Sequence, residues 1–169
     1  MPGMISCPMI SYGGSYSVDD AHMELTVPSW LRRRSLPAGI SLQVFSRSDD
    51  LETIVFESSG KWLYPLLELE QFIALKALDP ASLVLHDQVA GQAAAALAVR
   101  LGFKLVKARM MSSLACPWYD RHRVAYCYDT LVPHIACMTE QLVDDSMGLE
   151  QVYDLIVARV KKNRTANHC

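Results

Sequence analysis

The stretch "LVLHDQVAGQAAAALAVRLG" at residues 83–102 constrains the fold more than any other part of the chain. Its short apolar run is typical of a strand covered on both faces, and an alanine-rich helix follows, ending at Leu101 with Gly102 as a left-handed cap. Alanine side chains let a helix backbone lie close to a sheet. We therefore predict a buried strand that leads directly into a core helix. The free N–H groups of that helix, near Ala90 and Gly91, favour an anionic group.

The segments on either side predict strands and helices in alternation. A β-hairpin is expected in residues 40–60, a first helix from Pro65 to before Pro80, strands in 103–108 and 122–128 with a short helix between them, and a closing amphipathic helix in 146–163. Alternating strands and helices imply right-handed crossovers and a mostly parallel sheet. The expected fold class is α/β, a three-layer α/β/α sandwich with an opening hairpin, on which the last helix packs.

The length of 169 residues suits one domain. Residues 39–163 are expected to form it, followed by a short tail at 164–169. Residues 1–38 are rich in Pro, Gly, Ser and Met and have no sustained period, so we expect a flexible N-terminal extension. The basic triplet Arg32–Arg34 in this extension is typical of a solvated charge run, although it could also contact an acidic partner.

Composition excludes several classes of function. A net charge of −2 gives no electrostatic reason to expect a nucleic acid or an anionic membrane as partner. No stretch reaches the roughly 18 apolar residues that a membrane span needs, and no signal peptide is evident, so we expect a cytoplasmic protein. The five cysteines are scattered without a Cys-x-x-Cys pair, which argues against a disulfide framework and a zinc ribbon. We expect no metal and no cofactor.

The polar residues after the apolar run leave two interpretations open. Asp87 is either a binding or catalytic carboxylate, or a cap that accepts backbone N–H groups of the following turn. Gly91 either allows a ligand close to the helix start or only satisfies turn geometry. His86 ends an apolar strand and has no partner at the spacing of metal ligands.

Four segments carry a resemblance to a known family. They are "ESSGKWLYPLLEL" after the hairpin, "DQVAGQAAA", "SSLA" beginning at Ser112, and "VPHI" at residues 132–135. They resemble, in order, four segments of an uncharacterised prokaryotic family with a cytidine deaminase-like fold. The first family segment contains Ser, Gly and Pro-Leu, and the second is Asp-Lys-Val-Val-Gly-Lys-Ala-Ala-Ala. The third is Ser-x-x-Ala, and the fourth is Val-Pro-x-Ile. The resemblance covers about Val55 to Glu150 and implies that fold here.

Zinc deaminases build their site at two helix amino ends, which carry His-x-Glu and Pro-Cys-x-x-Cys. Laid on this chain, those motifs place Gln92 and Ala94 near the first pair, and Ser113 and Cys116 near the two cysteines. Of these four, Cys116 alone is a good metal ligand, so the resemblance implies the fold without the zinc chemistry.

The chain also departs from the family at polar positions. Gln88 and Gln92 stand where the second family segment has lysines, so two cations are missing from an anion site. Cys137 and Met138 stand where the family tends to have Asn-Arg, and Met147 and Gly148 stand where it has Cys-Pro. We therefore expect a diverged member.

Three hypotheses of function follow. The first is a protein that binds a nucleotide or another phosphate-bearing small molecule at helix amino ends. Its candidate ligand-binding residues are Asp87, Gln88, Gly91, Gln92, Ser112 and Ser113, with Ser58, Gly60 and Lys61 from the hairpin exit. The second is a metal-independent enzyme in which Asp87 is base or nucleophile and Ser112 orients the substrate.

The third hypothesis is a non-catalytic interaction protein, which includes a homo-oligomer. Its docking elements would be the N-terminal extension, the last helix, or the aromatic residues Trp62, Trp118 and Tyr119 if these are exposed and not part of the core. A zinc site formed by His86, Cys116, Cys127 or His134 has no support from their spacing.

Overall fold

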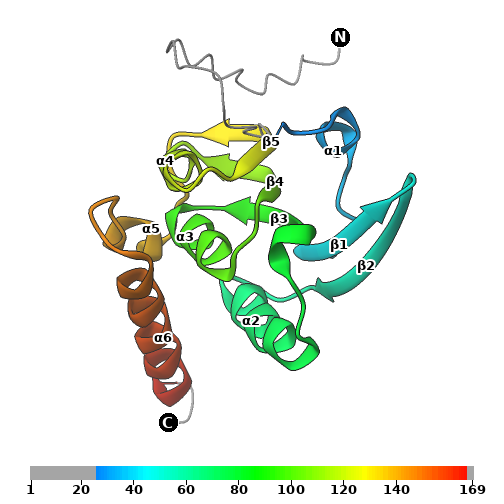
Figure 1. The fold of residues 1–169 in the computed structure, drawn as a ribbon. Helices are drawn as coiled ribbons and strands as arrows, with labels where there is room; N and C mark the ends of the chain where they lie inside the picture. The colour runs from blue at the N-terminus through cyan, green and yellow to red at the C-terminus, as the bar shows by residue number, and fades with distance from the viewer. Residues whose placement is uncertain (1–25, 167–169) are drawn as a thin grey trace, which may run out of the picture.

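The computed structural model describes residues 26–166, which form one five-stranded open sheet with helices (Figure 1). The strands are β1 (Leu42–Ser48), β2 (Leu51–Ser58), β3 (Val84–Ala90), β4 (Leu105–Ser112) and β5 (Ala125–Val132). Their order across the sheet is β2-β1-β3-β4-β5. The pairs β3–β4 and β4–β5 are parallel, whereas β1 is antiparallel to both β2 and β3. The expected α/β class is confirmed, and the sheet is mixed.

The opening hairpin is confirmed, and two aspartates make its turn. Asp49 and Asp50 both have positive φ, 49° and 65°, and they join β1 to β2 where Ser48 pairs with Leu51. A two-residue loop with two left-handed residues matches the twist of antiparallel strands, and Asp tolerates this conformation better than most residues. The hairpin thereby puts β1 beside β3 and leaves β2 at the sheet edge.

Helices α2 (Tyr64–Lys76), α3 (Gln92–Leu101) and α4 (Cys116–Arg121) share one hydrophobic core with one face of the sheet. Pro65 lies in the first turn of α2, as expected, and Gly102 ends α3 with a φ of 98°. The strand side chains in this core include Val44, Leu85 and Val106. A 3-10 turn (Pro80–Ser82) lies between α2 and β3.

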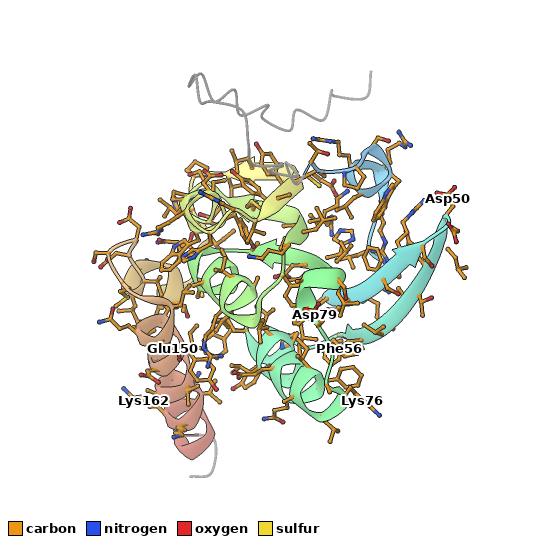
Figure 2. The ribbon with its side chains drawn as sticks, viewed as in Figure 1. Asp50, Phe56, Lys76, Asp79, Glu150 and Lys162 are labelled. Carbon is orange, nitrogen blue, oxygen red and sulfur yellow. The ribbon has the colours of Figure 1, made fainter. Side chains whose placement is uncertain are left out.

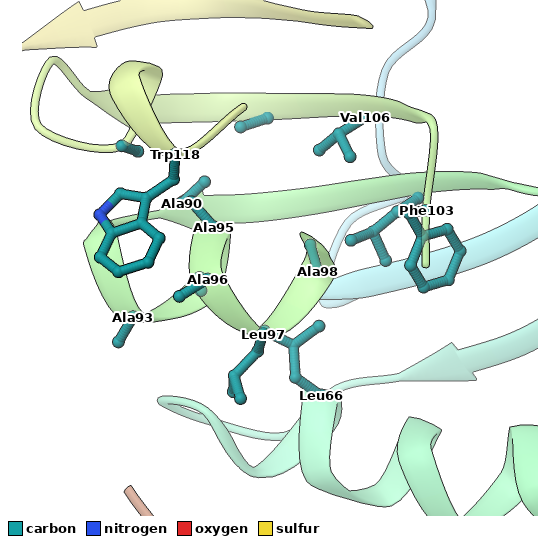
Figure 3. Close-up of a cluster of buried hydrophobic side chains, with 14 of the residues drawn as sticks. Leu66, Ala90, Ala93, Ala95, Ala96, Leu97, Ala98, Phe103, Val106 and Trp118 are labelled. Carbon is teal, nitrogen blue, oxygen red and sulfur yellow. The ribbon is translucent and has the colours of Figure 1, made fainter. Parts of the chain in front are cut away.

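The alanine-rich helix α3 is the centre of this core (Figure 3). Ala95 is 0% exposed and Ala98 is 1% exposed, so the helix backbone lies close to the sheet as the sequence predicted. Figure 3 shows Trp118 of α4 over one end of α3 and Phe103 beyond the other. Close packing of this kind leaves no space for larger side chains at the buried alanines.

The opposite face of the sheet is covered by α1 (Ser29–Arg33) and the residues that follow it. Leu31 is 0% exposed and packs with Phe45, Val84 and Cys127. These strand residues alternate with those of the first core, and successive strand residues point to opposite faces. We call residues 26–40 the strap. The expectation of a flexible extension is wrong for residues 26–38, and residues 1–25 lie outside the described part.

The closing helix α6 (Leu149–Ala166) packs mainly on α3, where we expected it on the sheet. Val152 and Ile156 are fully buried on its apolar stripe, whereas Glu150 and Lys162 are exposed (Figure 2). Glu150 pairs with Arg100 of α3 at 2.9 Å. A five-residue helix, α5 (Met138–Leu142), precedes it and was not predicted. The expected tail at 164–169 is helical as far as residue 166, and 167–169 lie outside the described residues. In residues 26–166 no helix is long and apolar enough to cross a bilayer.

Candidate functional site

Asp87 lies inside β3, not in a turn after it. The strand continues to Ala90, and Asp87 Oδ1 accepts a hydrogen bond from the N–H of Val89 at 3.2 Å. Burial raises the pKa of Asp87 to about 7, although hydrogen bonds from the backbone of Val89 and Gln88 oppose this. The strand was expected to end at His86. It runs further because β1 and β4 pair with it on both sides.

Ser112 and Asp87 do not lie at one level of the sheet. Asp87 pairs with Ala108, and Ser112 lies four residues further along β4, which is roughly 13 Å at the rise of a strand. Ser112 Oγ accepts the N–H of Leu114 at 3.2 Å. Ser113 Oγ donates to the carbonyl of Pro133 at 3.0 Å. The two serines therefore stabilise the turn between β4 and α4.

The residues at the hairpin exit bond mainly to their own segment. Ser58 Oγ accepts the N–H of Gly60 at 3.1 Å, and Lys61 is exposed. A side chain at Gly60 would contact Ser58 and Pro65, so the glycine fits the tight path into α2. Within residues 26–166 no hydrogen bond joins Ser58, Gly60 or Lys61 to α3.

The amino end of α3, where we predicted an anion site, holds a carboxylate of the chain itself. Glu140 Oε2 accepts the N–H of Gln92 at 2.8 Å, and Glu140 is only 6% exposed. A Cβ at Gly91 would overlap this carboxylate, so Gly91 allows its close approach. Sequence reasoning missed Glu140 because it lies 48 residues from Gln92, in a segment without a periodic pattern.

The Gln92 side chain fixes the segment that carries Glu140. Its Nε2 donates to the carbonyl oxygens of Glu140 at 3.3 Å and of Val143 at 2.9 Å, and its Oε1 accepts from Trp118 Nε1 at 3.4 Å. Among the other positions laid over the zinc motifs, Ala94 is buried in the core and Cys116 is half-buried. Burial raises the pKa of the Cys116 thiol.

A row of polar side chains lies on the opposite face of the sheet, under the strap. Gln43, His86 and Lys107 are direct neighbours on β1, β3 and β4, and each is at most 3% exposed. The middle of a sheet face is usually apolar, and buried polar groups need partners. Here the partners come largely from the strap.

Arg34 of the strap connects this row to the hairpin. It donates to Gln43 Oε1 and shares a hydrogen bond with His86 Nδ1, both at 2.7 Å, and it pairs with Glu52 at 2.9 Å. Since guanidinium is a donor, His86 Nδ1 is the acceptor. Burial, aided by the charges of Arg34 and Lys107, lowers the pKa of His86 to about 3, so its ring is neutral.

Lys107 binds the strap backbone to the sheet. Its Nζ donates to the carbonyl oxygens of Arg32 at 2.7 Å and Arg34 at 2.6 Å, and it pairs with Asp129 at 2.8 Å. The ammonium is 1% exposed, so its charge is compensated entirely by these acceptors. The basic triplet that was expected to be solvated therefore includes Arg34, which is a structural residue.

A pocket of about 170 Å³ adjoins this row, over the carboxyl-terminal halves of the parallel strands. Its floor is Gln88 of β3, Arg109 of β4 and Asp129 of β5, and strap residues 35–40 line the rest. The strand pairs β3–β4 and β4–β5 keep the same register before and after Arg109. Gln88, Arg109 and Asp129 therefore lie side by side. Of these, sequence reasoning named Gln88. Within residues 26–166 the Arg109 side chain has neither a hydrogen-bond nor an ion-pair partner.

Two aromatic residues of the interaction hypothesis belong to the core. Trp118 and Tyr119 are each 1% exposed, so they offer no surface for docking, and Trp62 is half-buried with its Nε1 bonded to Thr139 Oγ1 at 3.1 Å. The described residues contain no group of three His, Cys, Asp or Glu side chains that could hold a metal ion.

Comparisons with known proteins agree on one family. The model of a domain of unknown function, DUF1893 (TM1506), matches residues 45–160, from β1 to α6. No curated protein matches the chain significantly. A 2.70 Å crystal structure of a DUF1893 family protein (TM1506) from Thermotoga maritima is 22% identical, covers 71% of this chain and 80% of that chain, and has a TM-score of 0.61. At this identity the likeness shows the fold alone. The strap lies outside the residues that the family model matches.

Proposed function

Because this chain belongs to the DUF1893 family, whose function is unknown, we propose a function from its own geometry: it binds a small phosphate-bearing or similarly anionic molecule in the pocket between the strap and the sheet. The observation that carries the proposal is the unpaired guanidinium of Arg109 in that pocket. Ligands of open α/β sheets commonly bind outside the carboxyl ends of the parallel strands. Arg109 lies three residues before the end of β4, so the pocket is nearer to this edge of the sheet than to the opposite one.

The charges around the pocket favour an anion. Asp129 is neutralised by Lys107 at 2.8 Å, so Arg109 leaves one net positive charge on the floor. A planar guanidinium binds phosphate or carboxylate through two parallel N–H bonds. The side-chain amide of Gln88 supplies a neutral donor and acceptor beside it.

The size of the pocket limits the ligand. Sites for drug-sized molecules enclose roughly 300–1,000 Å³, and this pocket encloses about 170 Å³. It therefore fits a phosphate or carboxylate with a few further atoms. A nucleotide would place its phosphate on Arg109 and leave its base outside the pocket.

Arg109→Gln tests this function. Loss of a hydrogen bond to a charged group costs about 1.5–3 kcal/mol, or roughly a 10- to 100-fold loss of affinity. Isothermal titration calorimetry with inorganic phosphate, ribose 5-phosphate and AMP should show this loss relative to the unsubstituted chain. Arg123→Gln is the matched control, because Arg123 is exposed just before β5, at the other end of that strand. Equal affinity of the Arg109 variant and the control would refute the proposal.

We also propose that the fold is of the cytidine deaminase-like type, without its zinc chemistry. The proposal is supported by two successive strand–helix units, β3–α3 and β4–α4, whose helix amino ends follow adjacent parallel strands. Zinc deaminases place their ligands at two such ends. Here Gln92 at the first end is bonded to Val143 and Trp118.

A second candidate function rests on Asp87. A carboxyl group whose pKa is about 7 has the acidity that general acid–base catalysis at neutral pH requires. A metal-independent enzyme using Asp87 is therefore the alternative. Turnover of any substrate found by screening would be abolished by Asp87→Asn in that case. Unchanged turnover in a folded Asp87→Asn variant would exclude it.

A further inference from the structure

The bond between Glu140 and α3 has the form of a bound ligand. A helix amino end carries unpaired N–H groups and a partial positive charge, and both favour an oxyanion. At α3 the oxyanion is a side chain from a different part of the chain, bonded to the Gln92 N–H at 2.8 Å. Gly91 has an extended conformation, φ −93° and ψ −174°, which any residue adopts, so backbone geometry does not require glycine there. The Glu140 carboxylate requires glycine at this position, because it occupies the volume that a Cβ of residue 91 would fill.

The internal carboxylate is only half satisfied. Glu140 is only 6% exposed, and its buried Oε1 has no hydrogen-bond partner within residues 26–166. A buried ionised oxygen without a donor costs free energy, since water would otherwise solvate it. The contact of Glu140 with α3 is therefore weaker than that of a fully bonded anion.

The element that carries Glu140 is small. Helix α5 has five residues, and Met138 and Leu142 are 66% and 43% exposed. Its links to the rest of the domain include the bond from Trp62 to Thr139 and those from Gln92 Nε2. Release of α5 therefore breaks these bonds and uncovers the buried residues Thr139 and Glu140, whereas β5 pairs with β4 and α6 packs on α3 independently of α5.

We propose that the amino end of α3 is a latent binding site for a small oxyanion, a carboxylate or a phosphate, and that Glu140 is the internal competitor that closes it. This site lies on the α3 side of the sheet, whereas the Arg109 pocket lies on the strap side, so the inference does not rest on the proposed function. A tethered group competes at an effective concentration on the order of millimolar. Free anions bind only where they exceed it or where Glu140 is removed.

Glu140→Ala opens the site and supplies the test. Acetate and inorganic phosphate, compared with chloride at equal ionic strength, should raise the urea midpoint of this variant in a saturable manner. They should also shift the NMR resonance of the Gln92 amide. We expect half-saturation at an anion concentration at least tenfold lower than in the unsubstituted chain. The same response should persist when Arg109→Gln is added, which separates this site from the pocket.

Two variants are matched controls. Gly91→Ala combined with Glu140→Ala fills the anion position with a methyl group, so the anions should have no more effect than chloride. Thr139→Val loosens α5 but keeps the carboxylate, and it should not gain the response of Glu140→Ala. An unresponsive Glu140→Ala variant, or an equal response of the double variant, would overturn the inference.

The unsubstituted chain provides a second measurement if Glu140→Ala does not fold. Hydrogen exchange in concentrated phosphate should become faster in residues 133–148 than in chloride, because the anion displaces Glu140. The Gln92 amide should stay protected, since it keeps a hydrogen-bond acceptor. Exchange that is identical in the two salts would refute displacement.

Discussion

Asp87 and His86 are adjacent in β3, and burial displaces their pKa values in opposite senses. Burial raises the pKa of Asp87 from 3.8 to about 7, and burial with the nearby cations lowers that of His86 from 6.5 to about 3. Each displacement makes the free energy of unfolding depend on pH. Substituting one residue should therefore expose the pH dependence that the other contributes.

The signs follow from the protons bound in each state. Between about pH 4 and 7 native Asp87 keeps a proton that the unfolded chain has released, so stability falls as pH rises. Between about pH 3 and 6.5 unfolded His86 takes up a proton that the native ring does not, so stability falls as pH falls. In the range they share, each slope is about 1.4 kcal/mol per pH unit, and the two nearly cancel.

The total effect of His86 is larger than that of Asp87. The difference between 6.5 and about 3 corresponds to about 5 kcal/mol for His86, which is 0% exposed. Asp87 has an upper bound of about 4 kcal/mol, and its side chain is only half-buried, so solvent screening reduces this to about 2 kcal/mol. Asp87→Asn removes the second contribution and leaves the first.

Urea unfolding followed by tryptophan fluorescence from pH 4.5 to 8 measures both effects. At pH 8 Asp87→Asn should be more stable than the unsubstituted chain by about 2 kcal/mol, because no charged carboxylate is buried. Below pH 6.5 it should lose stability by up to about 1.4 kcal/mol per unit, while the unsubstituted chain should lose less, because Asp87 offsets part of the His86 effect. Asp154→Asn, on the exposed side of α6, is the control for net charge. An Asp87→Asn profile parallel to that of the unsubstituted chain would refute this reasoning.

Two further substitutions test the packing on the two faces of the sheet. Lys107→Met should lower the free energy of unfolding in urea by about 3 kcal/mol, because two carbonyls and a carboxylate lose a buried cation. It should also speed trypsin cleavage in the strap. Asp129→Asn keeps the two bonds from Lys107 to the carbonyls, so it should lower the free energy of unfolding by only about 1 kcal/mol. A strap that resists trypsin in Lys107→Met would contradict the role given to this lysine. Ala95→Leu should cost about 1–3 kcal/mol by overpacking α3 against the sheet, whereas Ala74→Leu on the exposed side of α2 should leave the urea midpoint unchanged.

Local chemistry was sufficient to predict the hairpin and the core helix. The pair Asp49 and Asp50 lies between two β-type runs, and the run of alanines ends at Gly102, so each signal is contained in a few neighbouring residues. The end of β3 was predicted too early because Asp87 and Gln88 are polar and resemble a turn. They belong to the strand because β4 and β1 supply hydrogen-bond partners, which a local pattern does not contain.

The strap was not predictable for a related reason. A five-residue helix such as α1 has too few turns to show a hydrophobic period, and Leu31 is buried only because Phe45 and Val84 lie opposite it. The pocket depends on the sheet in the same way. Gln88 was named from its turn-like context, but Arg109 and Asp129 join it through the register of three strands, which the sequence does not reveal.

Lys107, Arg109 and the amino end of α3 are positively charged groups whose charges are compensated to different extents. This difference predicts which of the two proposed sites an anion fills first. Lys107 has the strap carbonyls and Asp129, and the amino end of α3 has Glu140. Arg109 has no such acceptor within residues 26–166. A free anion must displace a tethered group at α3 but displaces only water at Arg109. Arg109 should therefore fill first in the unsubstituted chain, and Glu140→Ala, which removes the tethered competitor at α3, should bring the half-saturation concentrations of the two sites closer together.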